Sequence, residues 1–213
     1  MIDSEAAAKA WLRTLPECDE PAMDRLERLV ALLAGENDRQ NLVSAGTLPN
    51  VWQRHIADSA QLLCHVPRET ASPWLDLGTG AGFPGLVIAA LRPDCEVVMV
   101  ESRGLRAAWL EHAKSALGLT NAVVVSERIE QVEARPMRVI SARAFAPFDR
   151  LLKLSARFST GDTFWLLPKG RSARQELQEL RGWNHLFHVE QSLTDSDAGL
   201  IVGQLIGKKG RKQ

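Results

Sequence analysis

The chain has 213 residues, of which 45% are hydrophobic and 24% are charged. This length and composition are ordinary for a globular protein and exclude collagen, coiled-coil and wholly disordered chains. Basic and acidic side chains both number 26, so the formal net charge is zero. A uniformly basic nucleic-acid binder is therefore excluded, but a local basic patch is not.

Charge is distributed unevenly along the chain. Residues 1–135 hold 13 basic and 19 acidic side chains, whereas residues 136–213 hold 13 basic and 7 acidic ones. The C-terminal part can therefore face phosphates. We predict that several of its basic side chains share one face of the molecule, drawn from Arg143, Arg150, Lys153, Arg157, Lys169, Arg171 and Arg174.

The three cysteines, Cys18, Cys64 and Cys95, show no CxxC spacing. We expect free thiols, and neither a disulfide framework nor a zinc site. The N-terminus is acidic and has no signal-peptide core, and no apolar run is long enough to span a membrane. These features predict a cytoplasmic protein without a metal or membrane contacts, and we expect a monomer.

Residues 1–70 read as an N-terminal helical extension, because their apolar side chains recur at helical spacing. Ser4 is a good helix cap, and Pro21 suits the first turn of a second helix. Three helices are predicted, over 4–12, from 21 to a stop at Gly35 or Asn37, and from about 47 to 66.

From residue 71 to 207, short apolar strands alternate with amphipathic helices, which favours an α/β fold with a parallel sheet covered on both faces. Residues 208–213 form a basic tail. Strands are predicted over 74–77, 95–100, 122–125, 139–142, 163–167, 185–190 and 200–206, and helices over 84–91, 105–117, 148–158 and 173–180.

The last two of these seven strands are joined by a turn-rich segment and should be antiparallel. A dinucleotide-binding domain has six parallel strands. Seven strands with a terminal hairpin are instead typical of the Rossmann-like class I methyltransferases, which use S-adenosylmethionine.

A glycine-rich loop, Leu75-Asp76-Leu77-Gly78-Thr79-Gly80-Ala81-Gly82-Phe83-Pro84-Gly85, follows a predicted strand and opens a helix. Read from Gly80, it matches the dinucleotide fingerprint of an NAD-dependent oxidoreductase. Read from Asp76, it offers a carboxylate and then three glycines, which suits adenosylmethionine. A carboxylate repels a pyrophosphate but attracts an α-ammonium, so Asp76 favours the methyl donor. A tight turn without a ligand is the remaining alternative.

Three further residues follow predicted strands and are candidates to hold the adenosine part of the donor. Glu101 ends the second strand, where a carboxylate can accept both ribose hydroxyls. Ile129 and Glu130 follow the third strand and are placed to flank the adenine ring.

The chain resembles the ribosomal small-subunit methyltransferase G family, also called glucose-inhibited division protein B. Five segments carry the resemblance in the family's order: Asn41-Leu42-Val43, Arg54-His55-Ile56-Ala57-Asp58-Ser59, the glycine-rich loop, Ser141-Ala142-Arg143-Ala144-Phe145-Ala146 and Lys169-Gly170. They lie within residues 25–206. Glu101 stands where the family usually has Asp, and Ala142 is an extra residue between Ser141 and Arg143.

The resemblance implies a bacterial enzyme that transfers a methyl group from S-adenosylmethionine to N7 of one guanine in 16S ribosomal RNA. Its partner would be that RNA or the small ribosomal subunit. By position it implies donor contacts at Gly78, Phe83, Ile129, Glu130 and Arg143. Together with Asp76, Gly80, Gly82 and Glu101, these residues make up the predicted cofactor site. A non-catalytic RNA-binding module is the alternative.

Guanine N7 has a free lone pair and no proton, so its methylation requires proximity and alignment more than a general base. No residue is firmly assigned as catalytic. Arg143, Lys169 and His55 are the candidates, with Lys169 directed to RNA and His55 paired with Asp58 on one helix face. Phe145, just beyond the fourth strand, is the best candidate to stack on a base.

Overall fold

One sheet organises the computed structural model, which describes residues 1–69 and 72–210. Within these residues the sheet has eight strands in the order β3-β2-β1-β4-β5-β8-β6, and β7 also pairs with β8. The strands are β1 (Trp74–Leu77), β2 (Val97–Val100), β3 (Ala122–Val125), β4 (Val139–Ala142), β5 (Phe164–Gly170), β6 (Trp183–His185), β7 (His188–Gln191) and β8 (Gly199–Lys208).

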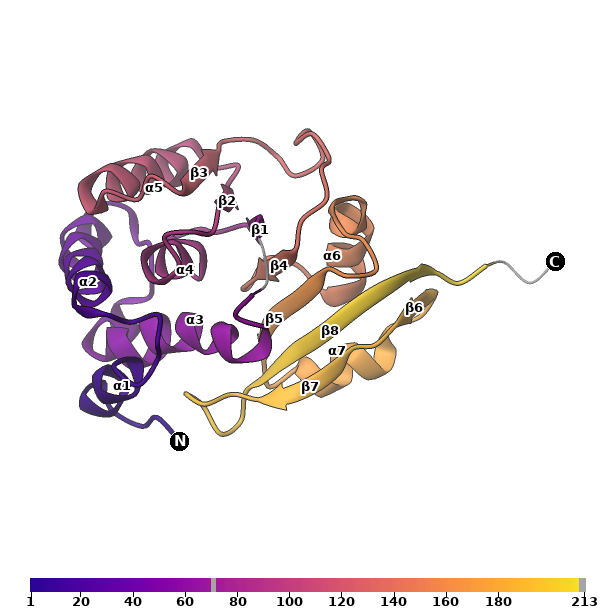
Figure 1. Cartoon of the computed structure of the whole chain (residues 1–213), viewed down its shortest axis with the longest axis horizontal. Helices are drawn as coiled ribbons and strands as arrows, with labels where there is room; N and C mark the ends of the chain where they lie inside the picture. The colour runs from indigo at the N-terminus through magenta and orange to yellow at the C-terminus, as the bar shows by residue number, and fades with distance from the viewer. Residues whose placement is uncertain (70–71, 211–213) are drawn as a thin grey trace.

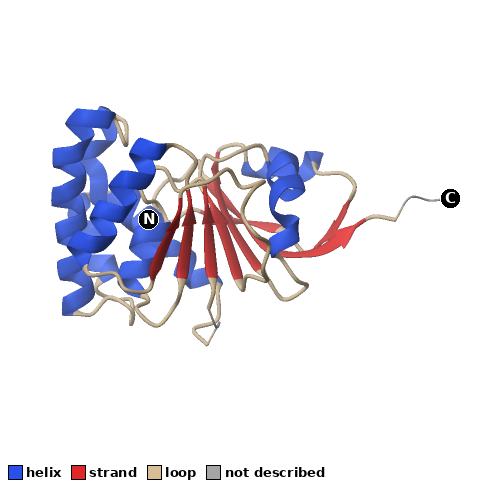
Figure 2. Ribbon diagram, turned by 90° about the horizontal axis from the view of Figure 1, so that it is seen from above, coloured by secondary structure: helices blue, strands red, loops and turns tan. Residues whose placement is uncertain are grey.

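Helices cover both faces of the sheet (Figure 2). The α-helices are α1 (Glu5–Leu12), α2 (Glu20–Gln40), α3 (Asp58–Ala60), α4 (Gly85–Leu91), α5 (Gly104–Leu117), α6 (Phe148–Ser155) and α7 (Ala173–Glu179). Four other helical segments are η1 (Ala45–Asn50), η2 (Trp52–Ala57), η3 (Gln61–His65) and η4 (Ala156–Phe158); η2 is a π-helix and the others are 3-10 helices.

The predicted class I methyltransferase fold is confirmed, with mostly parallel strands and an antiparallel C-terminal hairpin. The prediction of seven strands is wrong, because the strand expected over 185–190 is two strands, β6 and β7. They separate at Leu186 and Phe187, opposite Gly203. A Cβ on Gly203 would lie 2.4 Å from the Leu186 carbonyl oxygen, so the close approach of these backbones requires glycine there.

The second predicted helix ends later than expected. Helix α2 continues through Gly35 to Gln40 and stops at Asn41, whose φ of 47° is left-handed. Asn37 is also inside the helix, where its side chain is buried and accepts a hydrogen bond from the Val43 N–H at 2.8 Å. The side-chain contact of Asn37 fixes the chain that leaves the helix.

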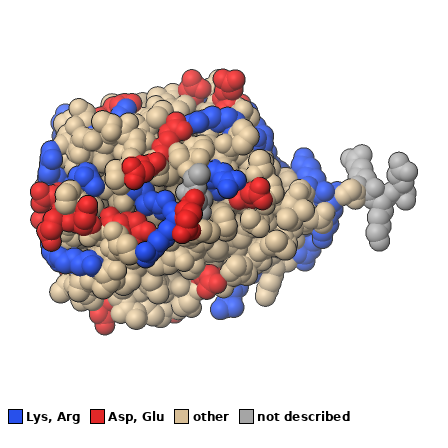
Figure 3. All heavy atoms as spheres, viewed as in Figure 1, with Lys and Arg blue, Asp and Glu red and all other residues tan. Residues whose placement is uncertain are grey.

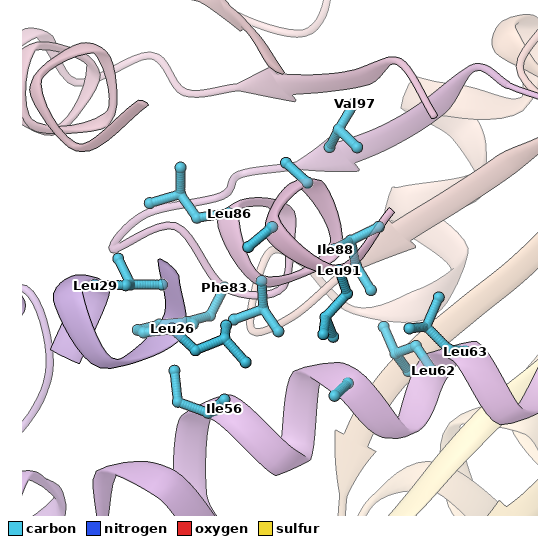
Figure 4. Close-up of a cluster of buried hydrophobic side chains, with 14 of the residues drawn as sticks. Leu26, Leu29, Ile56, Leu62, Leu63, Phe83, Leu86, Ile88, Leu91 and Val97 are labelled. Atoms are coloured by element: carbon cyan, nitrogen blue, oxygen red, sulfur yellow. The ribbon is translucent and has the colours of Figure 1, made fainter. Parts of the chain in front are cut away.

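The N-terminal helices share one hydrophobic core with the sheet. Buried side chains from α2, the 52–65 helical segment and α4 meet in a single cluster (Figure 4). On the opposite face of the sheet, Leu75 and Leu77 of β1 pack with side chains of α6 in a second hydrophobic cluster. The N-terminal helices therefore depend on the sheet to bury their apolar side chains.

The first residues of the chain contact the start of η2 and the β7–β8 turn. The Glu5 carboxylate accepts hydrogen bonds from the backbone N–H groups of Trp52 and Gln53, at 3.0 and 2.9 Å. The Ile2 N–H donates to the Leu193 carbonyl at 2.7 Å. The extreme N-terminus thus holds together two segments that lie far apart in the sequence.

Strand β8 is the longest strand of the described residues and runs away from the N-terminal helices to Lys208 (Figure 1). Lys208, predicted to begin the basic tail, is its last residue. Residues 211–213 of that tail lie outside the described part of the chain. No helix in the described part is long and apolar enough to cross a membrane.

Candidate functional site

The glycine-rich loop leaves β1 in a left-handed conformation. Gly78, Gly80 and Gly82 have φ values of 63°, 61° and 102°, which disfavour residues with a Cβ. Leu77, Val100 and Val125 end β1, β2 and β3 in register, so the segments that follow these strands lie side by side. This edge of the sheet brings the loop next to Glu101, as the sequence predicts.

Asp76 lies beneath the loop and is fully buried. Its Oδ2 accepts hydrogen bonds from the Gly85 N–H at 3.0 Å and from the Thr79 hydroxyl. Its Oδ1 accepts from the Ser141 hydroxyl at 2.8 Å. Burial raises the pKa of the Asp76 carboxyl, while these hydrogen bonds oppose the shift. These contacts make Asp76 a loop-positioning residue, and its direct contact with a cofactor stays a prediction.

Glu101 connects the loop to the end of β2. Its carboxylate is buried and accepts hydrogen bonds from the Gly80 N–H at 3.0 Å and the Arg103 N–H at 2.8 Å. Helix α5 supports the loop from the other side, where the Trp109 indole donates to the Ala81 carbonyl at 3.0 Å. The role of Trp109 was not predicted, because its spacing marks only a buried helix face.

The loop does not present a free helix N-terminus to a pyrophosphate. The first residue of α4, Gly85, already donates its N–H to Asp76, and Pro84 before it has no N–H. A phosphate at this point would face the Asp76 side chain instead of unpaired amides. This arrangement argues against the dinucleotide alternative.

Two predicted adenine neighbours follow β3 in a turn. Ile129 is buried, and its carbonyl accepts a hydrogen bond from Arg157, whereas Glu130 is exposed. The contacts of both residues with a cofactor stay predictions.

Arg143 stands at the end of β4 and joins the sheet to the helical extension. Its Nη1 lies 3.3 Å from both the Arg54 carbonyl and Asp58 Oδ2, and its Nη2 lies 3.2 Å from His55 Nδ1. The guanidinium also lies 5.2 Å from the centre of the Phe83 ring. The residues predicted from the glycine loop, from residues 54–59 (the RHxxDS segment) and from the end of β4 therefore meet at Arg143.

His55 is buried between Phe83, Arg143 and η1. Its ring stacks on Phe83 with centroids 5.1 Å apart, and its Nε2 lies 2.9 Å from the Thr47 hydroxyl. Burial, together with the charges of Arg143 and Arg54, lowers the pKa of His55 to about 3. The imidazole is therefore neutral at ordinary pH. It lies in the π-helical segment η2, a geometry often found at functional sites.

Asp58 and Arg54 tie the same helical segment to the β7–β8 turn. Asp58 Oδ1 accepts from the Thr194 hydroxyl at 2.8 Å, and Arg54 pairs with Asp195 at 3.0 Å. The RHxxDS segment thus contacts Arg143 at the end of β4, Phe83 of the glycine loop and the β7–β8 turn.

A cleft of about 1040 Å³ opens beside Arg143. Leu42, Val43 and the RHxxDS segment line one side, and the ends of β4 and β5 with α7 line the other. Its charged lining is mixed, with Arg54, Arg143 and Lys169 against Asp58, Glu176, Glu179 and Asp195. Basic and acidic side chains are also interspersed on the face in Figure 3. Of the seven basic residues predicted to share one face, Arg143 and Lys169 line this cleft, and they lie among acidic side chains there.

Lys169 is paired rather than free. Only 9% of its side chain is exposed, and its Nζ lies 2.9 Å from Glu176 Oε2 and 2.8 Å from the Ala146 carbonyl. Glu176 also accepts from the Phe148 N–H at 2.9 Å. Burial opposes ionisation of Glu176, but its hydrogen bonds with Lys169 and Ser172 outweigh it and lower the pKa. The pair clamps the β4–α6 loop to α7, and an RNA contact by Lys169 stays a prediction.

A family model described as rRNA small subunit methyltransferase G matches residues 22–197 of the chain. The chain belongs to this family. It is 59% identical to ribosomal RNA small subunit methyltransferase G of Novosphingobium aromaticivorans, over 97% of this chain and 90% of that protein. It is 58% identical to the protein of the same name from Erythrobacter litoralis, over 96% and 98% of the two chains.

The fold is shared with solved methyltransferases of low sequence identity. A SAM-dependent methyltransferase from Aquifex aeolicus matches with a TM-score of 0.58 and 14% identity, covering 74% of this chain and 93% of that one. Membership of the methyltransferase G family confirms the predicted family, the enzyme class and S-adenosylmethionine as the methyl donor. The oxidoreductase alternative is not favoured.

Proposed function

We propose that the chain methylates N7 of one guanine in 16S ribosomal RNA, with the glycine loop holding S-adenosylmethionine and the cleft at Arg143 receiving the RNA. The observation that carries the proposal is the meeting of Phe83, His55 and Arg143 between the loop and the cleft. The methyltransferase G relatives are named for small-subunit ribosomal RNA, and we take that RNA, within the bacterial cytoplasm, as the substrate.

The residues of the loop fit the methyl donor. Three glycines with positive φ give the loop a backbone path that disfavours a Cβ, and Glu101 provides a carboxylate beside Gly80 for the ribose hydroxyls. Asp76 fixes the loop from below, and Ile129 with Glu130 completes the rim. When bound, S-adenosylmethionine supplies an electrophilic methyl group on its sulfonium.

His55 is not available as a general base in this site. One of its ring nitrogens contacts Arg143 and the other contacts Thr47, and its pKa is low. Guanine N7 carries no proton, so the proposed reaction requires no base from the chain. The role left to the protein is alignment, which can supply roughly 7–11 kcal/mol of a reaction barrier.

Arg143 is the residue placed to orient the base. Its contacts with Arg54, Asp58 and His55 use three of the five N–H donors of a guanidinium. Two donors remain for guanine O6 or a phosphate. The three contacts hold the guanidinium in a defined plane, so we infer that Arg143 positions the base while N7 stays free to react.

The test is methyl transfer to undermethylated small ribosomal subunits with labelled S-adenosylmethionine, followed by chemical cleavage at N7-methylguanine. We expect one labelled guanine with the natural chain and none with Gly78→Arg. Gly118→Arg is the matched control, because Gly118 has nearly the same φ, 65° against 63°, and open space around it. Failure of the natural chain to label any subunit RNA would refute the proposal. RNA binding that survives in Gly78→Arg without any methyl transfer by the natural chain would favour the non-catalytic module.

A further inference from the structure

Phe145 lies between the glycine loop and the cleft. A Cβ placed on Gly78 would lie 2.3 Å from Phe145 Cδ2, so the ring rests on the glycine backbone. The half-buried Phe145 also lines the cleft beside Arg143. This side chain therefore touches both the proposed methyl-donor site and the proposed RNA site.

Phe145 packs against the second hydrophobic cluster, and the residues on both sides of it are held by side-chain contacts. Arg143 is held by Asp58 and His55, and the Ala146 carbonyl is held by Lys169. Only Ala144 and Phe145 lie between these two anchors. Ala144 has a φ of 53°, a strained conformation for alanine that persists only where the surroundings enforce it. Rotation about the Phe145 side-chain bonds is therefore the motion that this segment permits.

A ligand seated on Gly78 and the Phe145 ring cannot fill the same space. We propose that Phe145 is an aromatic gate: the methyl donor displaces its ring from Gly78 into the cleft, where the ring stacks on the target base. This inference rests on the proposed function, since it assumes that the donor binds at Gly78. Aromatic rings commonly stack on unpaired bases. The gate makes RNA binding depend on prior donor binding.

The first measurement is calorimetric binding of S-adenosylhomocysteine, the demethylated form of the donor. A protein that must first move a side chain binds more weakly, in proportion to the fraction already in the competent state. Phe145→Ala should therefore bind this ligand more tightly than the natural chain, by up to about tenfold if roughly one molecule in ten is competent. Phe164→Ala is the matched control, because Phe164 is also half-buried but begins β5 at the opposite edge of the sheet.

The second measurement is the affinity for undermethylated small subunits, with and without S-adenosylhomocysteine. We expect the natural chain and Phe145→Tyr to bind the subunits more tightly when the ligand is present. Phe145→Ala should show no such dependence, because it has no ring to place in the cleft. Phe145→Leu also lacks the ring but keeps an apolar contact with the loop. It replaces Phe145→Ala in this measurement if thermal unfolding shows that Phe145→Ala is not folded.

The outcomes separate the gate from the proposed function. Equal or weaker ligand binding by Phe145→Ala, with normal binding by the natural chain and Phe164→Ala, overturns the gate alone. Ligand-dependent subunit binding that persists in Phe145→Ala overturns it as well. Absence of S-adenosylhomocysteine binding by the natural chain overturns both the proposed function and the gate.

Discussion

The guanidinium of Arg143 donates a hydrogen bond to Nδ1 of His55 over 3.2 Å. Because arginine has no acceptor, Nδ1 carries no proton, and the single ring proton of neutral His55 lies on Nε2. That nitrogen then donates to the Thr47 hydroxyl at 2.9 Å. The tautomer of the histidine is thus set by its two neighbours, and through it the RHxxDS helix fixes the plane of Arg143.

His55 should remain neutral in the pH range where an unperturbed imidazole takes up a proton, because burial and the charges of Arg143 and Arg54 lower its pKa to about 3. Proton NMR of the imidazole signals should show no titration of His55 between pH 8 and pH 5, with His55→Gln used to assign its signal. A midpoint near 6.5 would contradict the contacts described here.

The same shift makes the folded protein less stable in acid. An unfolded histidine binds a proton below pH 6.5, whereas folded His55 does not until about pH 3. The contribution of His55 to the free energy of unfolding is therefore fully present above pH 6.5. It falls by about 1.4 kcal/mol per pH unit below that value, down to the folded pKa. Urea unfolding at pH 7 and pH 5 should show a smaller difference for His55→Gln than for the natural chain. Equal differences would contradict this assignment.

Asp76→Asn tests the buried carboxylate under the glycine loop. The carboxylate accepts three hydrogen bonds, and the asparagine NH₂ group cannot accept one. We expect a loss of roughly 1–3 kcal/mol in the free energy of unfolding, the usual effect of one unsatisfied buried group. Asp162→Asn, at an exposed position, should change it little. Equal stability of Asp76→Asn and the natural chain would show that the network contributes nothing.

Alanine substitutions at two glycines distinguish the stability cost of backbone strain from that of steric crowding. Gly118 closes α5 with φ 65° and has open space around it, whereas a Cβ on Gly82 would lie 2.3 Å from Leu86 Cδ1. Gly118→Ala should cost about 1–2 kcal/mol of stability through the left-handed backbone alone. Gly82→Ala adds overpacking, typically 1–3 kcal/mol, and should also weaken S-adenosylhomocysteine binding. Thermal unfolding and calorimetry measure the stability and the ligand affinity of the two variants. Equal stability and equal affinity of the two would refute the prediction.

Lys169→Met distinguishes a clamp from a phosphate contact. A lysine that neutralises one phosphate changes the slope of log affinity against log salt by about 1. Lys169 is instead buried against Glu176, so we expect lower stability and an unchanged salt slope for binding to small subunits. Arg174→Met is the control. Because Arg174 is exposed, we expect loss of its charge to leave the stability unchanged. A slope reduced by one with unchanged stability would assign Lys169 to RNA.

Much of the architecture follows from local pattern. The strands at Trp74–Leu77, Ala122–Val125 and Val139–Ala142 have the bounds that their short apolar runs predict. Gly35 misled the prediction of α2, because a glycine in an exposed helix position weakens a helix without ending it when packing elsewhere supports it. The break between β6 and β7 depends on Gly203, which is distant in sequence, so no local pattern marks it.

The sequence predicts which residues lie at the ends of the strands, but it does not predict the hydrogen bonds and ion pairs that connect their side chains. Asp76 and Ser141 occupy paired positions in β1 and β4, and this register brings the hydroxyl to the carboxylate. Spacing along the chain cannot show such a pairing before the strand order is known. The pairing of Lys169 with Glu176 likewise depends on how α7 packs, and it altered the interpretation of a residue that composition alone marks as basic and exposed.

The contacts of Ile2 and Glu5 have a practical consequence for work with this enzyme. They place the start of the chain against Leu193 and the first residues of η2, beside the segments that line the cleft. Any tag fused before Met1 would emerge next to the cleft that we propose receives the RNA. Strand β8 ends far from that region (Figure 1). A purification handle therefore belongs at the C-terminus, where it leaves the approach of a particle much larger than the enzyme unobstructed.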